Sequence, residues 1–252
     1  MNKTTLLTIP PSHYCEKARW ALDLAGVSYD EEGHAPIIHY AFVYPRTRSK
    51  TVPVLVREGH APIVDSTEIL RWVDTQLSQG ARLFPTEHDA AVSELEDTFD
   101  EKLGVATRRL AYCHVAKSKA LFAAAFFGDL QGAEKVVVQT GEAVMRRLLG
   151  KAFNVSDRAE ERSRKKVQEI FDDVATRLDG GDYLVGSRFT AADLTFVALA
   201  NPVLMLGQDL GRIEGAAPAF GELVRHFRET PAGRYAARIH ANHRPTKTAR
   251  AS

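Results

Sequence analysis

Residues 50–68 read KTVPVLVREGHAPIVDSTE and decide the fold of the first part of the chain. Val54–Val56 and Pro62–Val64 are short apolar strand candidates, and the glycine at 59 between them is typical of a hairpin turn. Asp65 precedes the periodic apolar residues of a helix, with Glu68 three positions later, which is the spacing of a capping box. The stretch therefore predicts a strand, a tight turn, a second strand and a capped helix.

Two features of this stretch are suited to holding a ligand. Pro53 stands at the first residue of a strand, and a cis bond before it would turn the N–H and C=O of Val52 away from the sheet. These groups would then be able to pair with an extended peptide. Asp65 and Ser66 stand at a helix N-terminus, where free amides attract a carboxylate, while the Asp65 side chain attracts an ammonium group. A peptide-like ligand carrying both groups fits the two features together.

The preceding residues predict a β-α-β unit. Residues 4–9 form a short buried strand candidate that ends at two prolines, and Ser12 is a good N-cap for a helix that stops at about Gly26. Residues 27–31 are the next strand candidate, which a right-handed crossover would place parallel to the first. The combined order, β-α-β followed by β-β-α, is that of a thioredoxin-like α/β domain. Residues 33–50 are rich in aromatic and basic side chains and are interpreted either as a functional loop or as a surface loop with one short helix.

The pattern changes after residues 79–87, which contain Gly80 and Pro85 and lack periodicity. Apolar residues then recur every three or four positions from Leu95 to Leu110, which indicates a helix, and Cys113 continues the stripe as a buried residue. Further helices are expected at 118–129, 133–149 and 158–178. The C-terminal part is therefore predicted to be all-α.

Composition limits the function classes. The 252 residues carry a formal net charge of +1, 44% hydrophobic and 26% charged residues, so no global field favours nucleic acid or an anionic membrane. No signal peptide or membrane span is recognisable. The two cysteines, Cys15 and Cys113, lie far apart and indicate a reducing compartment, with the cytoplasm expected. His240 and His243 lack a third ligand at suitable spacing, so no metal is expected.

The order of Val-Pro, hairpin and Asp-Ser-Thr-Glu resembles the glutathione-binding half of cytosolic glutathione S-transferases. The resemblance extends to residues 4–26 and to residues 183–199. It agrees with a thioredoxin-like domain at 1–80, a linker at 81–88 and an all-α domain at 89–241, followed by a flexible basic tail at 242–252. It implies glutathione as co-substrate, detoxification as the family role, a homodimer, and a small hydrophobic electrophile or a peroxide bound between the domains.

The resemblance also implies roles for individual residues. Val52, next to Pro53, would pair through its backbone with the cysteinyl part of glutathione, and Asp65 and Ser66 would hold the γ-glutamyl end. On charge alone, Lys50 or His39 would meet the glycyl carboxylate. Candidate wall residues for the second substrate are Tyr112, Arg108 and Phe122.

Three residues compete for the chemistry at the first helix. Ser12 matches the residue of serine-type classes (tau, phi and theta) that donates a hydrogen bond to the glutathione thiolate, although it also fits a plain N-cap. Cys15 lies in the first helical turn, where the dipole would depress its pKa, but it shares a side with Ala18 and Leu22, which favours burial. Tyr14 would supply a hydroxyl as in tyrosine-type classes. Lys17 and Arg19 are expected to be solvated.

Three functions follow from these alternatives. The first is a glutathione transferase that activates the thiolate, the second a glutathione-dependent thiol oxidoreductase using Cys15, and the third a non-catalytic glutathione-binding or partner module. Thr190 and Asp193 form a predicted capping box that we assign to folding.

Overall fold

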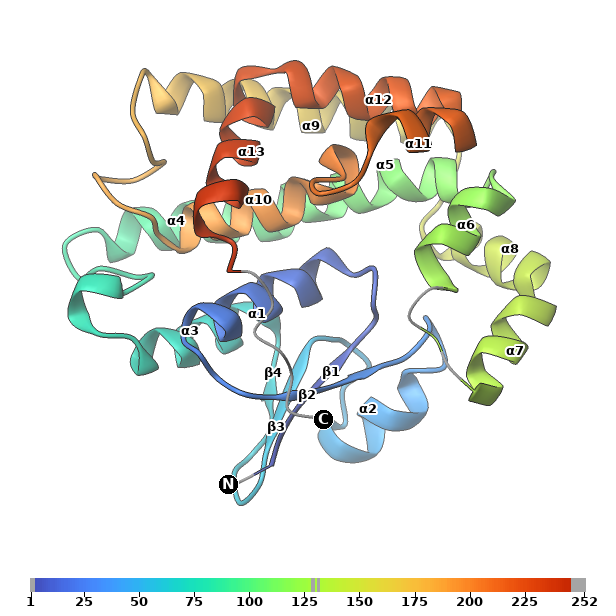
Figure 1. The fold of residues 1–252 in the computed structure, drawn as a ribbon, viewed down its shortest axis with the longest axis horizontal. Coiled ribbons are helices and arrows are strands. Elements are labelled where there is room, and N and C mark those ends of the chain that lie inside the picture. Colours follow the sequence, from blue (N-terminus) through green and yellow to red (C-terminus); the bar gives the residue numbers. More distant parts are fainter. Residues whose placement is uncertain (1–2, 128–129, 131, 246–252) are drawn as a thin grey trace.

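A computed structural model describes residues 3–127, 130 and 132–245. A small sheet with its own helices lies on one side of the molecule, and a layer of helices lies on the other (Figure 1). Helix α1 (His13–Leu24) lies between the two, because it packs on α3 (Ser66–Gln76) within the first part and on α10 (Ala191–Leu204) of the second. The thioredoxin-like α/β part followed by an all-α part, as expected from the sequence, is confirmed.

The sheet has four strands in the order β2-β1-β3-β4. Strand β1 (Thr4–Thr8) pairs in parallel with β2 (Asp30–Gly33) and antiparallel with β3 (Val54–Arg57), which pairs antiparallel with β4 (Ile63–Val64). The parallel pair requires a crossover, which α1 supplies. The second strand begins three residues later than the predicted 27–31, at Asp30.

Two helix starts agree with the sequence. Ser12 caps α1, and Asp65 caps α3 by accepting a hydrogen bond from the Thr67 amide at 2.8 Å. Residues 33–50 contain one short helix, α2 (Tyr40–Thr47), on the surface of the domain. The predicted linker is fixed rather than loose, because the Leu83 and Phe84 amides donate to the buried Asp74 carboxylate at 2.6 and 3.1 Å.

The second part is entirely helical among the described residues. Its elements are α4 (Asp89–Thr98), a π-helical segment (Phe99–Gly104), α5 (Val105–Val115), α6 (Lys119–Phe126), α7 (Gly132–Thr140), α8 (Glu142–Ala152), α9 (Asp157–Leu178), α10, α11 (Leu210–Ala216), α12 (Pro218–Glu229) and α13 (Pro231–His243). The single helix predicted over 133–149 is wrong: Gly141 separates α7 from α8. Glycine is a poor helix former, so the chain breaks there.

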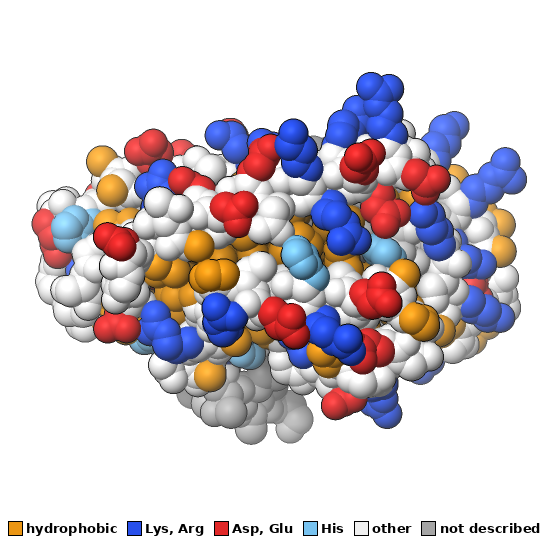
Figure 2. All heavy atoms as spheres, turned by 90° about the horizontal axis from the view of Figure 1, so that it is seen from above, with side chains coloured by type: hydrophobic (Ala, Val, Ile, Leu, Met, Phe, Trp, Pro, Cys, Tyr) orange, Lys and Arg blue, Asp and Glu red, His pale blue; other side chains and the backbone are white. Residues whose placement is uncertain are grey.

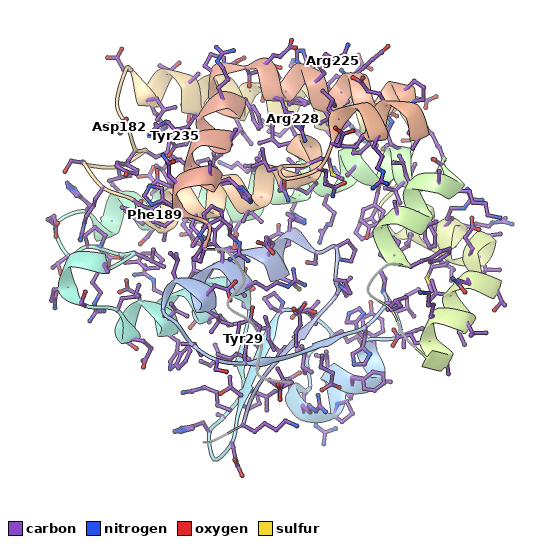
Figure 3. All side chains as sticks on the ribbon, viewed as in Figure 1. Tyr29, Asp182, Phe189, Arg225, Arg228 and Tyr235 are labelled. Atoms are coloured by element: carbon purple, nitrogen blue, oxygen red, sulfur yellow. The ribbon has the colours of Figure 1, made fainter. Side chains whose placement is uncertain are left out.

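Helix α10 is the centre of the helical part, since nearly all of its residues are buried. Its start is the predicted capping box: the Thr190 amide donates to Asp193 at 2.7 Å. Asp193 also accepts from the Leu184 amide and from the Tyr235 hydroxyl of α13. Figure 3 shows Tyr235 and Phe189 at the same end of this layer. The Thr190 hydroxyl is a fourth donor, at 2.9 Å, and four donors around one carboxylate agree with a structural role for Asp193.

The C-terminal end of α13 contradicts the prediction of a flexible tail from residue 242. The His243 carbonyl accepts a hydrogen bond from the Trp20 indole at 3.0 Å, and Arg244 bonds Glu16 at 2.8 Å and Asp23 at 2.7 Å. The basic side chain that suggested a solvated tail instead fastens α13 to α1. The remainder of the predicted tail, 246–252, lies outside the described residues.

The outer face of the helical layer carries acidic and basic side chains side by side, with lysine and arginine more frequent toward one end (Figure 2). Such mixing fits the near-neutral net charge. Within the described part of the chain, no helix combines the length and apolarity needed to cross a bilayer.

Candidate functional site

Ser12 lies half-buried at the N-terminus of α1, immediately after the strand β1 and its two prolines. Its hydroxyl accepts a hydrogen bond from the Cys15 amide at 3.4 Å, and its own amide donates to the Ile9 carbonyl at 2.9 Å. The hydroxyl accepts in this contact through a lone pair, so the contact does not use the hydroxyl proton. Ser12 is therefore both an N-cap and an available donor at the positive end of a helix dipole.

Cys15 does not have the environment of a reactive thiol. Its side chain is 0% exposed, and burial raises the pKa of the thiol. Desolvation, which raises the pKa of the thiol, thus outweighs the helix dipole, which would lower it. Because the thiolate is the nucleophile, burial and a raised pKa disfavour a redox role for Cys15. Cys113 is buried as well, as expected from its place in the apolar stripe.

Tyr14 faces the helical domain. Its hydroxyl donates to the Asp100 carbonyl at 2.7 Å, and burial raises the pKa of the phenol to about 12. Because its proton is donated to a carbonyl and its pKa is raised, the Tyr14 phenol is poorly suited to activate the thiol of a ligand. The neighbouring His13 is also directed across the interface, where its Nε2 donates to the Gly104 carbonyl at 2.9 Å. Tyr14 and His13 therefore hold the two domains together.

The Val52–Pro53 peptide bond is cis. Among the described residues, no hydrogen-bond partner is found for the Val52 amide or carbonyl, and Val52 is only half-buried. The Pro53 carbonyl accepts from the Asp65 amide at 3.3 Å, which connects this edge to the start of α3. The two features that the sequence singled out are thus adjacent in space.

The tip of α3 carries an unusual backbone and an unsatisfied hydroxyl. Asp65 has φ 89°, a conformation that non-glycine residues rarely adopt and that occurs preferentially at functional sites. Ser66 is 1% exposed, and within the described chain its Oγ has no hydrogen-bond partner. Buried hydroxyls are normally paired, so Ser66 calls for a partner that the protein alone does not provide.

Lys50 and His39 lie near this edge but play different parts. His39 is buried, its Nε2 donates to the Lys50 carbonyl at 3.0 Å, and burial lowers the pKa of the imidazole. Burial and a lowered pKa disfavour the cationic form of the ring, and its hydrogen bond instead positions the loop before Val52. Lys50 is exposed, with its ammonium 5.6 Å from the centre of the Tyr40 ring.

A buried ionic network lies directly behind the tip of α3. Lys17 is 0% exposed, and its ammonium donates to Asp100 at 2.8 Å, to Thr67 at 3.1 Å and to Glu96. Thr67 in turn donates to either carboxylate, Glu96 at 2.8 Å or Asp100 at 3.0 Å. Burial raises the pKa of both carboxyls. The network joins α1, α3 and the helical domain at one point.

The expectation that Lys17 and Arg19 are solvated is therefore wrong. Arg19 is also buried and pairs with Glu31 at 2.7 Å. The sheet domain covers one side of α1 and α10 covers the other, so charged side chains on either side are buried. The signal that was available is the spacing of Glu96 and Asp100, four residues apart beside the apolar stripe, which places two acids on one helix face.

The candidate wall residues divide into two groups. Phe122 is 0% exposed and packs on Phe126 with ring centres 4.9 Å apart, so it belongs to a core cluster and not to a wall. Tyr112 and Arg108 are half-buried on one face of α5, and both contact the Phe153 ring. Arg108 also lies 5.7 Å from the centre of the Tyr14 ring. No group of three or more metal-ligating side chains occurs among the described residues.

Two family profiles match the chain. One, described as glutathione S-transferase, N-terminal domain, matches residues 6–80, and the other, glutathione S-transferase, C-terminal domain, matches residues 139–231. Together they cover well over half of the sequence. The second profile includes the capping box of α10, and the first includes Ser12, Val52, Asp65 and Ser66.

Solved structures with the same fold include a glutathione S-transferase I bound with lactoylglutathione, at 16% identity and a TM-score of 0.58, covering 94% of this chain and 99% of that one. A glutathione S-transferase of Methylobacterium radiotolerans in complex with glutathione sulfonate has 19% identity and a TM-score of 0.55, with 99% and 100% covered. The β-etherase LigF of Sphingobium sp. strain SYK-6 has 17% identity and a TM-score of 0.60, with 93% and 98% covered. With both of its domains matched by the family profiles, this chain belongs to the cytosolic glutathione S-transferase superfamily.

Proposed function

We propose that this protein is a glutathione transferase that binds glutathione between the Val52 edge and the tip of α3. The observation that carries the proposal is that two groups at adjacent positions lack a hydrogen-bond partner among the described residues: the Val52 backbone and the Ser66 hydroxyl. An extended tripeptide satisfies the first by strand addition and the second with its γ-glutamyl carboxylate. The structures of similar fold that hold lactoylglutathione and glutathione sulfonate support the same assignment.

The remaining groups receive roles consistent with their positions. Asp65 is exposed at the same tip and would meet the γ-glutamyl ammonium, while the exposed Lys50 would meet the glycyl carboxylate. The Ser12 hydroxyl would donate a hydrogen bond to the glutathione sulfur, which favours the thiolate at the positive end of the α1 dipole. Attack on a small electrophile then depends on thiolate formation and on proximity. We further expect a cytoplasmic homodimer, by analogy with the family.

Isothermal titration calorimetry with glutathione tests the binding step. We expect saturable heat at millimolar ligand and a matching upward shift of the melting temperature. The absence of both would refute the proposal. Saturable binding without turnover of any electrophile in a broad panel would instead identify a non-catalytic glutathione-binding module.

Ser12→Ala tests the chemical step, with a chlorinated nitroaromatic acceptor as second substrate. We expect kcat/KM to fall by about tenfold or more and the pKa seen in its pH profile, that of the bound thiol, to rise, since a hydrogen bond to a charged group contributes about 1.5–3 kcal/mol. Ser156→Ala is the matched control, because Ser156 caps α9 in the same way, accepting from the Ala159 amide at 3.3 Å, but far along the chain from the site. Equal turnover in the two variants would remove Ser12 from the mechanism.

A further inference from the structure

Arg108 is a cation without a counter-charge at the boundary between the domains. It is half-buried on α5, and among the described residues no carboxylate or carbonyl lies within ion-pair or hydrogen-bond distance of its guanidinium. Three other partly or fully buried arginines are paired, Arg19 with Glu31, Arg82 with Asp74 and Arg146 with Glu142. The half-buried Arg57 instead lies over the Trp72 ring, within one domain. Asp100 and Asp65, the two acids that act on Tyr14 together with Arg108, accept from Lys17 and from the Thr67 amide.

Aromatic rings from three elements surround this guanidinium. Its centre lies 5.7 Å from the Tyr14 ring of α1 and 5.1 Å from the Phe153 ring that follows α8. Tyr112, one turn along α5, stacks on Phe153 with ring centres 4.2 Å apart and planes 15° from parallel. Aromatic rings offer no carboxylate or carbonyl oxygen, so these contacts leave the N–H donors of the guanidinium available for a planar, bidentate anion. The arrangement thus offers ring surfaces and an anion donor side by side.

Arg108 also faces the start of α1. Burial, and after it the Arg108 charge, lowers the pKa of His13, and the same charge opposes the burial that raises the pKa of Tyr14. These two residues directly follow Ser12. Helix α1 would therefore hold the glutathione sulfur at its start, and the facing helix α5 contributes the guanidinium.

We propose that Arg108 selects second substrates that carry an anionic group, such as a carboxylate, on an aromatic ring. This inference rests on the proposed function. The ring would stack among Tyr14, Tyr112 and Phe153, and the anion would accept two N–H donors from Arg108. For a chloronitrobenzoate, the glutathione thiolate forms a carbon–sulfur bond at the ring carbon that bears chlorine. The carbon–chlorine bond then breaks, and chloride leaves with the bonding electron pair. The proton released when the thiol ionises passes to solvent.

Two substrates with the same chloronitro ring, one anionic and one neutral, test the inference: 4-chloro-3-nitrobenzoate and its methyl ester, each compared between wild type and variant. We expect Arg108→Met to lower kcat/KM for the carboxylate by about tenfold or more, the factor for 1.4 kcal/mol, and to change that for the ester by less than about twofold. Arg108→Lys keeps the charge but lacks the planar guanidinium, so its kcat/KM for the carboxylate should lie between those of wild type and Arg108→Met. Arg109→Met is the matched control, since Arg109 is the adjacent half-buried arginine on a different face of α5, and it should leave the ratio unchanged.

The inference is overturned if Arg108→Met leaves the ratio of kcat/KM for the carboxylate to kcat/KM for the ester unchanged, whether both values fall equally or neither falls. Turnover of the ester with glutathione would still leave the proposed function intact. If neither substrate reacts and glutathione produces no heat, the proposed function fails. In that case calorimetric titration with 3-nitrobenzoate and methyl 3-nitrobenzoate still decides the matter. Preferential binding of the carboxylate, lost in Arg108→Met, supports an anion-selective wall, and equal or absent binding refutes it.

Discussion

Lys17→Met removes the one cation that, among the described residues, bonds both Glu96 and Asp100, and it leaves these two buried acids facing each other. The lost contacts are three donations from one ammonium, at 2.8 Å to Asp100, at 3.1 Å to Thr67, and to Glu96. Methionine fills a similar volume, so the cost is electrostatic and not a cavity. Removing one partner of a buried pair costs about 3–5 kcal/mol, which is the expected loss in unfolding free energy at pH 7.

The loss should depend on pH in a direction fixed by the raised pKa values of Glu96 and Asp100. A carboxyl whose pKa is raised on folding contributes stability below its unfolded pKa, and this contribution is lost as pH rises through the folded pKa. Without Lys17, both carboxyls lose the attraction that lowers their pKa, so they resist ionisation further. The variant should therefore be much closer to wild type at pH 4.5 than at pH 7.

Urea denaturation at the two pH values measures both effects. Lys117→Met is the control, because Lys117 is half-exposed and pairs with Asp157 and Glu160 at 3.1 Å, an interaction that is screened and contributes at most about 1 kcal/mol. A second variant, Lys17→Met with Glu96→Leu, should recover part of the stability, since apolar replacement of a whole pair is often neutral. A loss below about 1 kcal/mol, or a loss independent of pH, would refute the reasoning.

Three further predictions concern single residues. Ser66→Ala should raise the calorimetric Kd for glutathione by about tenfold while changing the melting temperature little, because the unpaired hydroxyl contributes no internal hydrogen bond; an unchanged Kd counts against the site. Asp193→Ala should lower the free energy of unfolding in urea by about 3 kcal/mol or more, because the buried donors of Leu184, Thr190 and Tyr235 lose their acceptor. The Kd for glutathione should not change, and a changed Kd at full stability would contradict a structural role. Cys15 should resist alkylation and oxidised glutathione in the native protein and react after unfolding, as mass spectrometry would show; rapid native labelling reopens the redox hypothesis.

Local chemistry accounts for the parts of the fold that were predicted correctly. Ser12 and Asp65 are capping residues, and the glycine at 59 suits a hairpin turn, so each of these residues acts within a few positions of itself. The capping box of Thr190 and Asp193 is equally local. Such signals are legible in a sequence because their physical cause does not depend on distant segments.

The features that were missed depend on packing between distant segments. Lys17 is buried because helices from both domains cover α1, and its partners lie 79 and 83 residues away. Arg244 fastens α13 to α1 through Glu16, 228 residues away, although its own neighbourhood is polar and basic. His39 carries no local signal that distinguishes a buried ring from an exposed cation. The break at Gly141 depends on a small propensity difference that tertiary contacts can override in either direction.

The central claim is that the Val52 backbone and the Ser66 hydroxyl together hold glutathione. Amide resonances of the ¹⁵N-labelled protein, followed during a glutathione titration, test it most directly. The account predicts that the Val52 and Ser66 amides shift together along one saturation curve, while those of the α9 surface stay unchanged. Saturable shifts confined to other segments, or no shifts at millimolar glutathione, would contradict it.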